Sequence, residues 1–112
     1  MILLQIILEQ QIEILRRESI MSFPFSDEPN VATIICCHVM YGDPVLYASH
    51  DDDGMWQFLC GRIHSEEEAR IVSLHEAFTL DSSIGALADM PCGYCATRAN
   101  KNADWIIRKC SN

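Results

Sequence analysis

The segment Cys92-Gly93-Tyr94-Cys95 carries two cysteines with two residues between them. Such a pair can form a redox disulfide or supply half of a zinc site. A thioredoxin-like site places the pair after a strand and at the start of a helix, where the helix dipole stabilises the thiolate. Here a helical pattern that stops at Pro91 precedes the pair, and a strand pattern follows it. A small thiol-redox or zinc-binding protein using Cys92 and Cys95 is therefore kept as the alternative function.

A complete zinc site needs four ligands, so two more donors would have to join this pair. The other sulfur and imidazole donors considered are Cys36, Cys37, His38, Cys60, His64 and Cys110. The cysteines among them form no second pair with the usual spacing of two to four residues. The sequence therefore predicts no metal site and no cofactor.

The acidic stretch Asp51-Asp52-Asp53-Gly54 invites comparison with the calcium loop of an EF-hand. If Gly54 is the sixth loop position, Ser49 is the first and Cys60 is the twelfth. The bidentate glutamate that calcium needs at the twelfth position is then missing. We therefore expect a solvated acidic turn.

No arrangement of residues marks an active site. The histidines that could serve as a general base are His38, His50, His64 and His75. A nucleophile pair of Cys37 or Cys60 with His50 stays open, although nothing in the sequence singles it out. The chain has no Gly-rich phosphate loop, no Gly-x-Ser-x-Gly and no His-Glu-x-x-His. We assign no catalytic residue and favour a function without catalysis.

The length and the charge narrow the class of protein. A chain of 112 residues that is 49% hydrophobic fits one globular domain. Its formal net charge of −8 argues against nucleic acid as a partner, because phosphate backbones are held mainly by Lys and Arg. The same charge suits a basic protein partner. Six cysteines without a credible secretory signal predict free thiols in a reducing cytoplasm.

Residues 1–20 differ from the rest, because Ile, Leu, Gln and Glu dominate there and Gly and Pro are absent. Apolar residues three or four apart predict a helix, but Glu and Gln interrupt the apolar run too often for a membrane span. Codons for Arg16-Arg17-Glu18 can form a purine-rich run that resembles a bacterial ribosome-binding site. Our hypothesis is that translation starts at Met21 and that residues 1–20 are an extension. An intact mass that matches all 112 residues would contradict it.

Hydrophobic patterns place the elements that must position these side chains. Residues 21–30 contain two prolines and predict a lead-in loop to a domain spanning 31–112. Strands are predicted at 31–40, 45–50, 55–61, 94–98 and 105–109, with a shorter one at 70–72. Capping-box spacing predicts a helical turn after Ser65 and a helix from Ser73 to about Leu80. Asp81 is expected to cap a further helical run before Pro91.

The acidic turn joins two of these strands into a hairpin, because Gly54 can take the positive φ that tight turns need. In the strand that follows, Trp56, Phe58 and Cys60 fall on one face and Gln57 on the other. Trp56 and Phe58 are therefore the predicted anchors of the core. The elements together predict an α+β fold, a mainly antiparallel sheet of about five strands with short helices on one side.

Several segments in this order resemble a small bacterial protein family of unknown function, and more distantly the immunity-protein-33-like domains of polymorphic toxin systems. They are Pro44-Val45-Leu46, His50-Asp51, Gly54, the run 56–61, Leu80-Asp81-Ser82-Ser83, Leu87-Ala88-Asp89 and Pro91-x-Gly93. The resemblance covers about residues 31–98. It implies a small α+β domain that binds a protein, such as a toxin, in the cytoplasm, and it brings no catalytic residues.

The first hypothesis is therefore a cytoplasmic, non-enzymatic, immunity-like binding protein. Its candidate contact residues are acidic, since a basic partner would be attracted to them. They are Asp51, Asp52, Asp53, Glu66 and Glu67.

Overall fold

The structure, a computed structural model, describes residues 23–62 and 65–110. The predicted extension at 1–20, its start site and His64 lie outside the described residues. Within these ranges the chain forms an α+β fold, as predicted, with one mixed sheet and a few short helices. No helix in the described ranges is long and apolar enough to cross a membrane.

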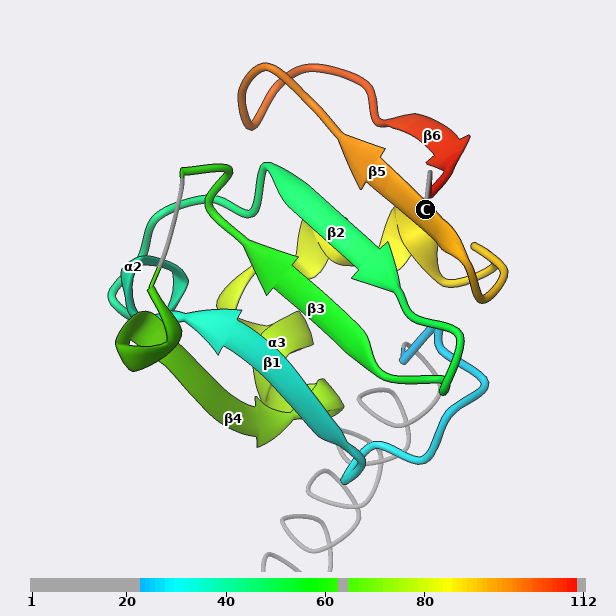
Figure 1. Cartoon of the computed structure of the whole chain (residues 1–112), viewed down its shortest axis with the longest axis horizontal. Helices are drawn as coiled ribbons and strands as arrows, with labels where there is room; N and C mark the ends of the chain where they lie inside the picture. Colours follow the sequence, from blue (N-terminus) through cyan, green and yellow to red (C-terminus); the bar gives the residue numbers. More distant parts are fainter. Residues whose placement is uncertain (1–22, 63–64, 111–112) are drawn as a thin grey trace, which may run out of the picture.

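The sheet has six strands in the order β4-β1-β3-β2-β5-β6 (Figure 1). Their bounds are Ala32–Cys36 for β1, Tyr47–His50 for β2, Trp56–Leu59 for β3, Ala69–Ser73 for β4, Tyr94–Thr97 for β5 and Ile106–Lys109 for β6. Four of the five neighbouring pairs are antiparallel. The pair β1–β3 is parallel, with Ile34 opposite Gln57 and Ile35 opposite Phe58. The carboxyl ends of β1 and β3 therefore meet at the same end of the sheet.

The prediction of a strand over 31–40 is right only for its first part. β1 ends at Cys36, and Cys37–Met40 form a single helical turn, α2. The amide of Tyr41 donates to the carbonyl of Cys37, and the amide of Gly42 donates to that of Val39. The apolar run continues through this turn because Val39 is buried in the core, so hydrophobicity alone did not mark the end of the strand.

The β2–β3 hairpin follows the prediction closely. The amide of Gly54 donates to the carbonyl of Asp51, and Gly54 has a φ of +90°. Trp56 and Phe58 are 1% and 0% exposed, and both belong to the core. The Trp56 ring stacks between those of His50 and Phe58, with ring centroids 3.8 Å and 5.6 Å away.

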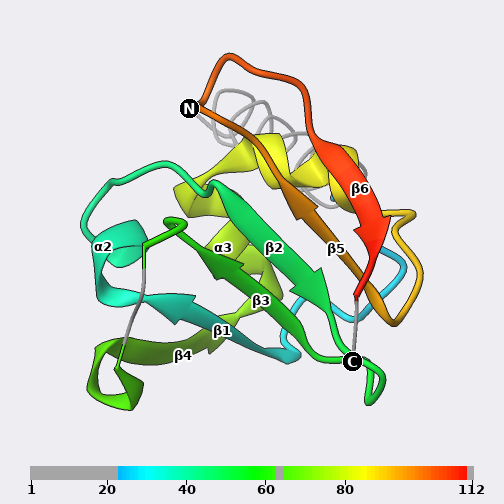
Figure 2. The ribbon, with the colours of Figure 1, turned by 45° about the horizontal axis from the view of Figure 1, so that its top comes forward.

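Short helices form a second layer behind the sheet, as Figure 2 shows. Helix α3 spans Leu74–Leu80, and the 3₁₀ helix η2 spans Ser82–Leu87. The predicted caps are present, since Ser73 Oγ accepts from the amide of Glu76 and Asp81 Oδ1 accepts from that of Ser83. The helical turn after Ser65 is the 3₁₀ helix η1, Glu66–Glu68, in which the Ser65 side chain makes no capping bond.

The core lies between the sheet and this helical layer. Its most buried large side chains are Trp56, Phe58, Ile35, Leu74, Ile84 and Leu87. The segment before β1 also takes part, because Phe25 is 5% exposed and its ring packs edge-on against Trp56 with centroids 5.2 Å apart.

Candidate functional site

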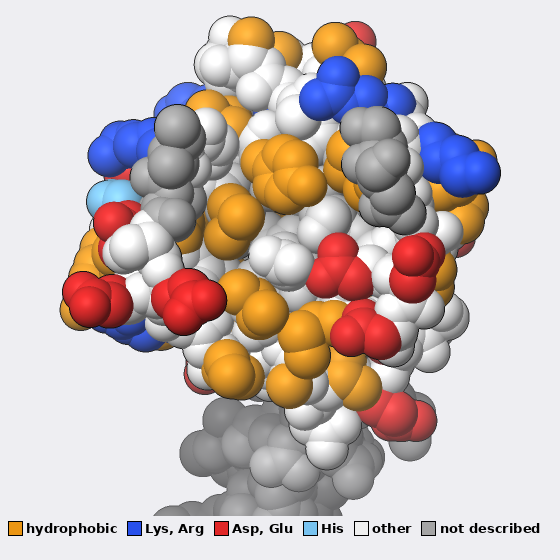
Figure 3. All heavy atoms as spheres, in the orientation of Figure 1, with side chains coloured by type: hydrophobic (Ala, Val, Ile, Leu, Met, Phe, Trp, Pro, Cys, Tyr) orange, Lys and Arg blue, Asp and Glu red, His pale blue; other side chains and the backbone are white. Residues whose placement is uncertain are grey.

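The helical layer covers one face of the sheet and leaves the other, which we call the open face, without helices. Side chains that alternate with the core positions project from it, and they include Ile34, Tyr47, Gln57, Leu59, Cys95 and Thr97. Figure 3 looks onto this face and shows hydrophobic side chains along its middle. Such a face, rimmed by polar groups, is typical of a binding surface.

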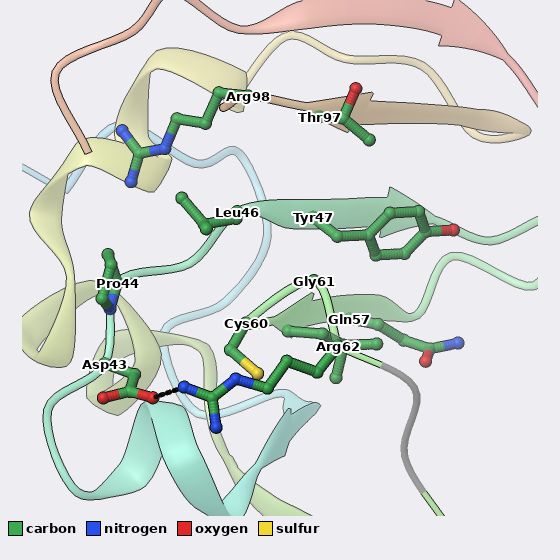
Figure 4. Close-up of a pocket in the computed structure, with 11 residues that line it drawn as sticks. Asp43, Pro44, Leu46, Tyr47, Gln57, Cys60, Gly61, Arg62, Thr97 and Arg98 are labelled. Carbon is green, nitrogen blue, oxygen red and sulfur yellow. Dashed lines mark hydrogen bonds and ion pairs between the residues drawn. The ribbon is translucent and has the colours of Figure 1, made fainter. Parts of the chain in front are cut away.

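A hollow of about 890 Å³ lies on the open face, at the end where β2 begins and β3 ends. Its lining residues are Asp43, Pro44, Leu46, Tyr47, Gln57, Leu59, Cys60, Gly61, Arg62, Thr97 and Arg98 (Figure 4). Across one side of it, Arg62 Nη2 lies 3.1 Å from Asp43 Oδ2. Both charged side chains are well exposed, so this ion pair can open to admit a partner group at little cost.

Tyr47 is the aromatic side chain of the hollow. Burial raises the pKa of its phenol above the ordinary value, and negative charge on the nearby sulfurs of Cys95 and Cys110 raises this pKa further. A hydrogen bond with Ser49 lowers it. The phenol is therefore neutral at physiological pH, when it can both donate and accept a hydrogen bond to a ligand.

The predicted residues Asp51, Asp52 and Asp53 lie at the β2–β3 turn, at one margin of the open face. Asp51 is held in place, because Oδ1 accepts from Ser49 Oγ at 3.0 Å and Oδ2 accepts from Gln57 Nε2 at 2.8 Å. Asp53 Oδ1 accepts from the amide of Met55. Asp52 and Asp53 are exposed, so their charges face solvent.

The predicted residues Glu66 and Glu67 lie in η1, which precedes β4 at the other side of the sheet (Figure 1). Both are exposed. Figure 3 shows acidic side chains in two groups with hydrophobic side chains between them. The fold thus brings two acidic segments that are separate in sequence to the margins of one face.

The structure places Cys92 and Cys95 on opposite sides of the sheet. Cys92 is exposed, and its Sγ lies 3.6 Å from Nε2 of His50, whose ring stacks on Trp56 on the core side. Cys95 is buried and pairs with Ser49, so its side chain projects toward the open face. This placement does not favour a shared disulfide or a shared metal, and none of the six cysteines forms a disulfide.

His50 contacts a different thiol from the two considered in the sequence. Its Nδ1 lies 2.7 Å from the carbonyl of Met90, which can only accept, so Nδ1 carries the proton and Nε2 faces Cys92. Cys60 instead contacts His38, with Sγ and Nδ1 3.7 Å apart. Cys92 does not line the hollow of the open face, so this thiol–imidazole pair has no substrate site beside it there.

A second cluster was missed from the sequence: Cys36, His38 and Cys60 bring their donor atoms within 4.8 Å of one another. Burial raises the pKa of the Cys60 thiol. The signal that could have found the cluster is Cys36-x-His38 at the end of one strand, together with Cys60 directly after another. Only the parallel pairing of those two strands unites them.

Comparisons of the chain with protein-family models, with curated proteins and with solved structures found no match.

Proposed function

We propose that this protein is a non-enzymatic binding domain whose open face holds a basic protein partner. The observation that carries the proposal is the arrangement of charge on that face, with acidic side chains at two margins of an apolar band and hollow. A partner with an apolar protrusion and basic side chains around it would complement such a surface in shape and in charge.

The size of the sheet indicates that the acidic margins take part. Six strands spaced about 4.8 Å apart, each of four or five residues rising about 3.3 Å, offer a flat area of roughly 400 Å². A stable interface usually covers about 800 Å² on each partner. A partner on the open face would therefore also contact the Asp51–Asp53 turn and η1.

The partner that we propose is a toxin, and the compartment is the cytoplasm. The resemblance of residues 31–98 to immunity-type domains supports a toxin as the partner. Six cysteines with no disulfide among them, one of them exposed, support a reducing compartment. The net charge of −8 supports a basic partner, since complementary charge speeds encounter and penalises acidic competitors.

The test is capture of a partner from the native host at low salt by the wild-type protein and by charge-reversed variants. Asp52→Lys combined with Glu67→Lys reverses one exposed charge at each margin. Asp89→Lys is the matched control, because this exposed residue follows η2 on the covered side.

We expect a basic protein that is recovered by the wild type and by the control and lost with the double variant. Raising the salt concentration should release it. Recovery of no basic protein, or equal recovery by the double variant, would contradict the proposal.

A further inference from the structure

Three potential metal ligands converge beyond the carboxyl ends of β1 and β3. Cys36 is the last residue of β1, His38 lies in α2, and Cys60 directly follows β3. The Sγ atoms of the two cysteines and one ring nitrogen of His38 lie within 4.8 Å of one another. Cys36 and Cys60 are 1% and 6% exposed, while His38 is half-buried, so the cluster sits at the surface of the core.

The convergence follows from the topology and not from sequence spacing. Since β1 and β3 run in parallel with Ile34 opposite Gln57, both strands end at the same side of the sheet. The chain then turns into α2 directly after Cys36, and this turn carries His38 back toward Cys60. In Figure 4 the sulfur of Cys60 points toward α2.

The separation between Cys60 and His38 matches that of two ligands in a zinc site. Zinc takes bonds of about 2.3 Å to sulfur and about 2.0 Å to nitrogen in tetrahedral geometry, so ligand sulfur and nitrogen lie roughly 3.6 Å apart. Here Cys60 Sγ and His38 Nδ1 are 3.7 Å apart. Two thiolates and an imidazole also favour zinc over magnesium or calcium, which prefer oxygen ligands.

A fourth donor lies beside His38. Oε2 of Glu68, the last residue of η1, is 3.8 Å from Nδ1 of His38. A carboxylate oxygen is an ordinary zinc ligand. Glu68 forms a group with Cys37 and His38, and its half-exposed side chain would turn toward the two sulfurs to complete the site. Cys37 is also close to His38 and Glu68, so it is the competing fourth donor.

We propose that Cys36, His38 and Cys60 bind one Zn²⁺ ion, with the carboxylate of Glu68 completing the site. The ion would join the ends of β1 and β3 to α2 and to η1. Because the folded chain would bind zinc and the unfolded chain would not hold the same geometry, zinc would stabilise the fold. This site does not depend on a protein partner, so it stands or falls separately from the proposed function.

The first measurement uses the full chain, freed of metal with a chelator and then titrated with Zn²⁺ and, in parallel, with Co²⁺. We expect one equivalent of either ion to bind, a rise in Tm with Zn²⁺, and sulfur-to-cobalt charge-transfer absorption with Co²⁺. Binding of no ion, or a cobalt spectrum without sulfur ligation, would overturn the proposal.

The second measurement assigns the ligands. Cys60→Ser, His38→Ala and Glu68→Gln should each weaken Zn²⁺ binding by at least about tenfold, since removing a group that only supports a ligand already costs that much. Cys92→Ser is the matched control, because this thiol lies outside the cluster and should leave affinity unchanged. Circular dichroism checks that each variant folds. If a ligand variant fails to fold, the sulfur-to-cobalt absorption of the wild type decides whether the cysteines bind the metal.

Equal affinity in the wild type, Cys60→Ser and His38→Ala would also overturn the proposal. In that case the two buried cysteines are small hydrophobic core residues.

Discussion

The guanidinium of Arg98 and the carboxylate of Asp81 form an ion pair at the edge of the core, with Nη2 3.3 Å from Oδ2. The two side chains are 3% and 16% exposed. Arg98 also donates through Nε to the carbonyl of Val45, and its Cζ lies 4.2 Å from the centre of the Trp105 ring. Asp81 Oδ2 accepts from the amide of Val45 as well. The pair thus ties the start of β2, the end of β5 and η2 together.

Replacing Arg98 by Ala should therefore destabilise the protein strongly. The variant leaves the carboxylate of Asp81 buried without its cation, and we expect the free energy of unfolding to fall by about 3 kcal/mol. Urea unfolding followed by circular dichroism measures it. Arg62→Ala is the matched control, since its ion pair with Asp43 is exposed and should be worth less than about 1 kcal/mol. Equal losses in the two variants would contradict this assignment.

Stability should also fall at alkaline pH, in part because of Tyr47. The pKa of Tyr47 is higher in the folded protein than the value of about 10 at which an unfolded tyrosine ionises. Between these two pKa values, the folded state therefore holds more protons than the unfolded state. The stability that Tyr47 contributes is fully present below the pKa of the unfolded state. It is lost as the pH rises through the pKa of the folded state. Urea unfolding across this range should show a steeper loss for the wild type than for Tyr47→Phe. Identical slopes would count against a role for Tyr47.

The cysteines should differ widely in reactivity in the folded protein. Cys92 is exposed, whereas Cys95 is buried in β5, so iodoacetamide should modify Cys92 first and Cys95 only after unfolding. Peptide mass spectrometry after short pulses measures the order of modification. Equal rates, or a Cys92–Cys95 disulfide formed without unfolding, would restore the alternative of a thiol-redox site.

The features that the sequence predicted are those with local causes. The hairpin depends on Gly54 and on the alternation of Trp56 and Phe58 with Gln57, all within a few residues. The cap of α3 depends on Ser73 and Glu76, three residues apart. Both are encoded by nearest neighbours along the chain, where periodicity and turn residues are informative.

The features that were missed depend on contacts between distant segments. A helical turn at Cys37–Met40 has the same apolar pattern as a strand, so periodicity could not separate them. The parallel pairing of β1 with β3 is set by the order of the strands in the sheet, which no local motif specifies. The Cys36–His38–Cys60 cluster and the Arg98–Asp81 pair follow from that order and were therefore also missed.

A buried hydroxyl in β1 offers a last prediction, this time of a gain in stability. Thr33 is 0% exposed, and its Oγ1 has no hydrogen-bond partner among the described residues. Threonine and valine are nearly the same shape, so Thr33→Val keeps the packing and removes a polar group that was buried without compensation. We expect the free energy of unfolding to rise by about 1 kcal/mol.

The control for this gain is Thr97→Val in β5, at a half-exposed position on the open face. We expect that change to stay within about 0.5 kcal/mol. Urea unfolding of both variants gives the comparison. A loss of stability in Thr33→Val would mean that Oγ1 has a partner, such as a buried water, and that the interior of β1 is more polar than its side chains indicate.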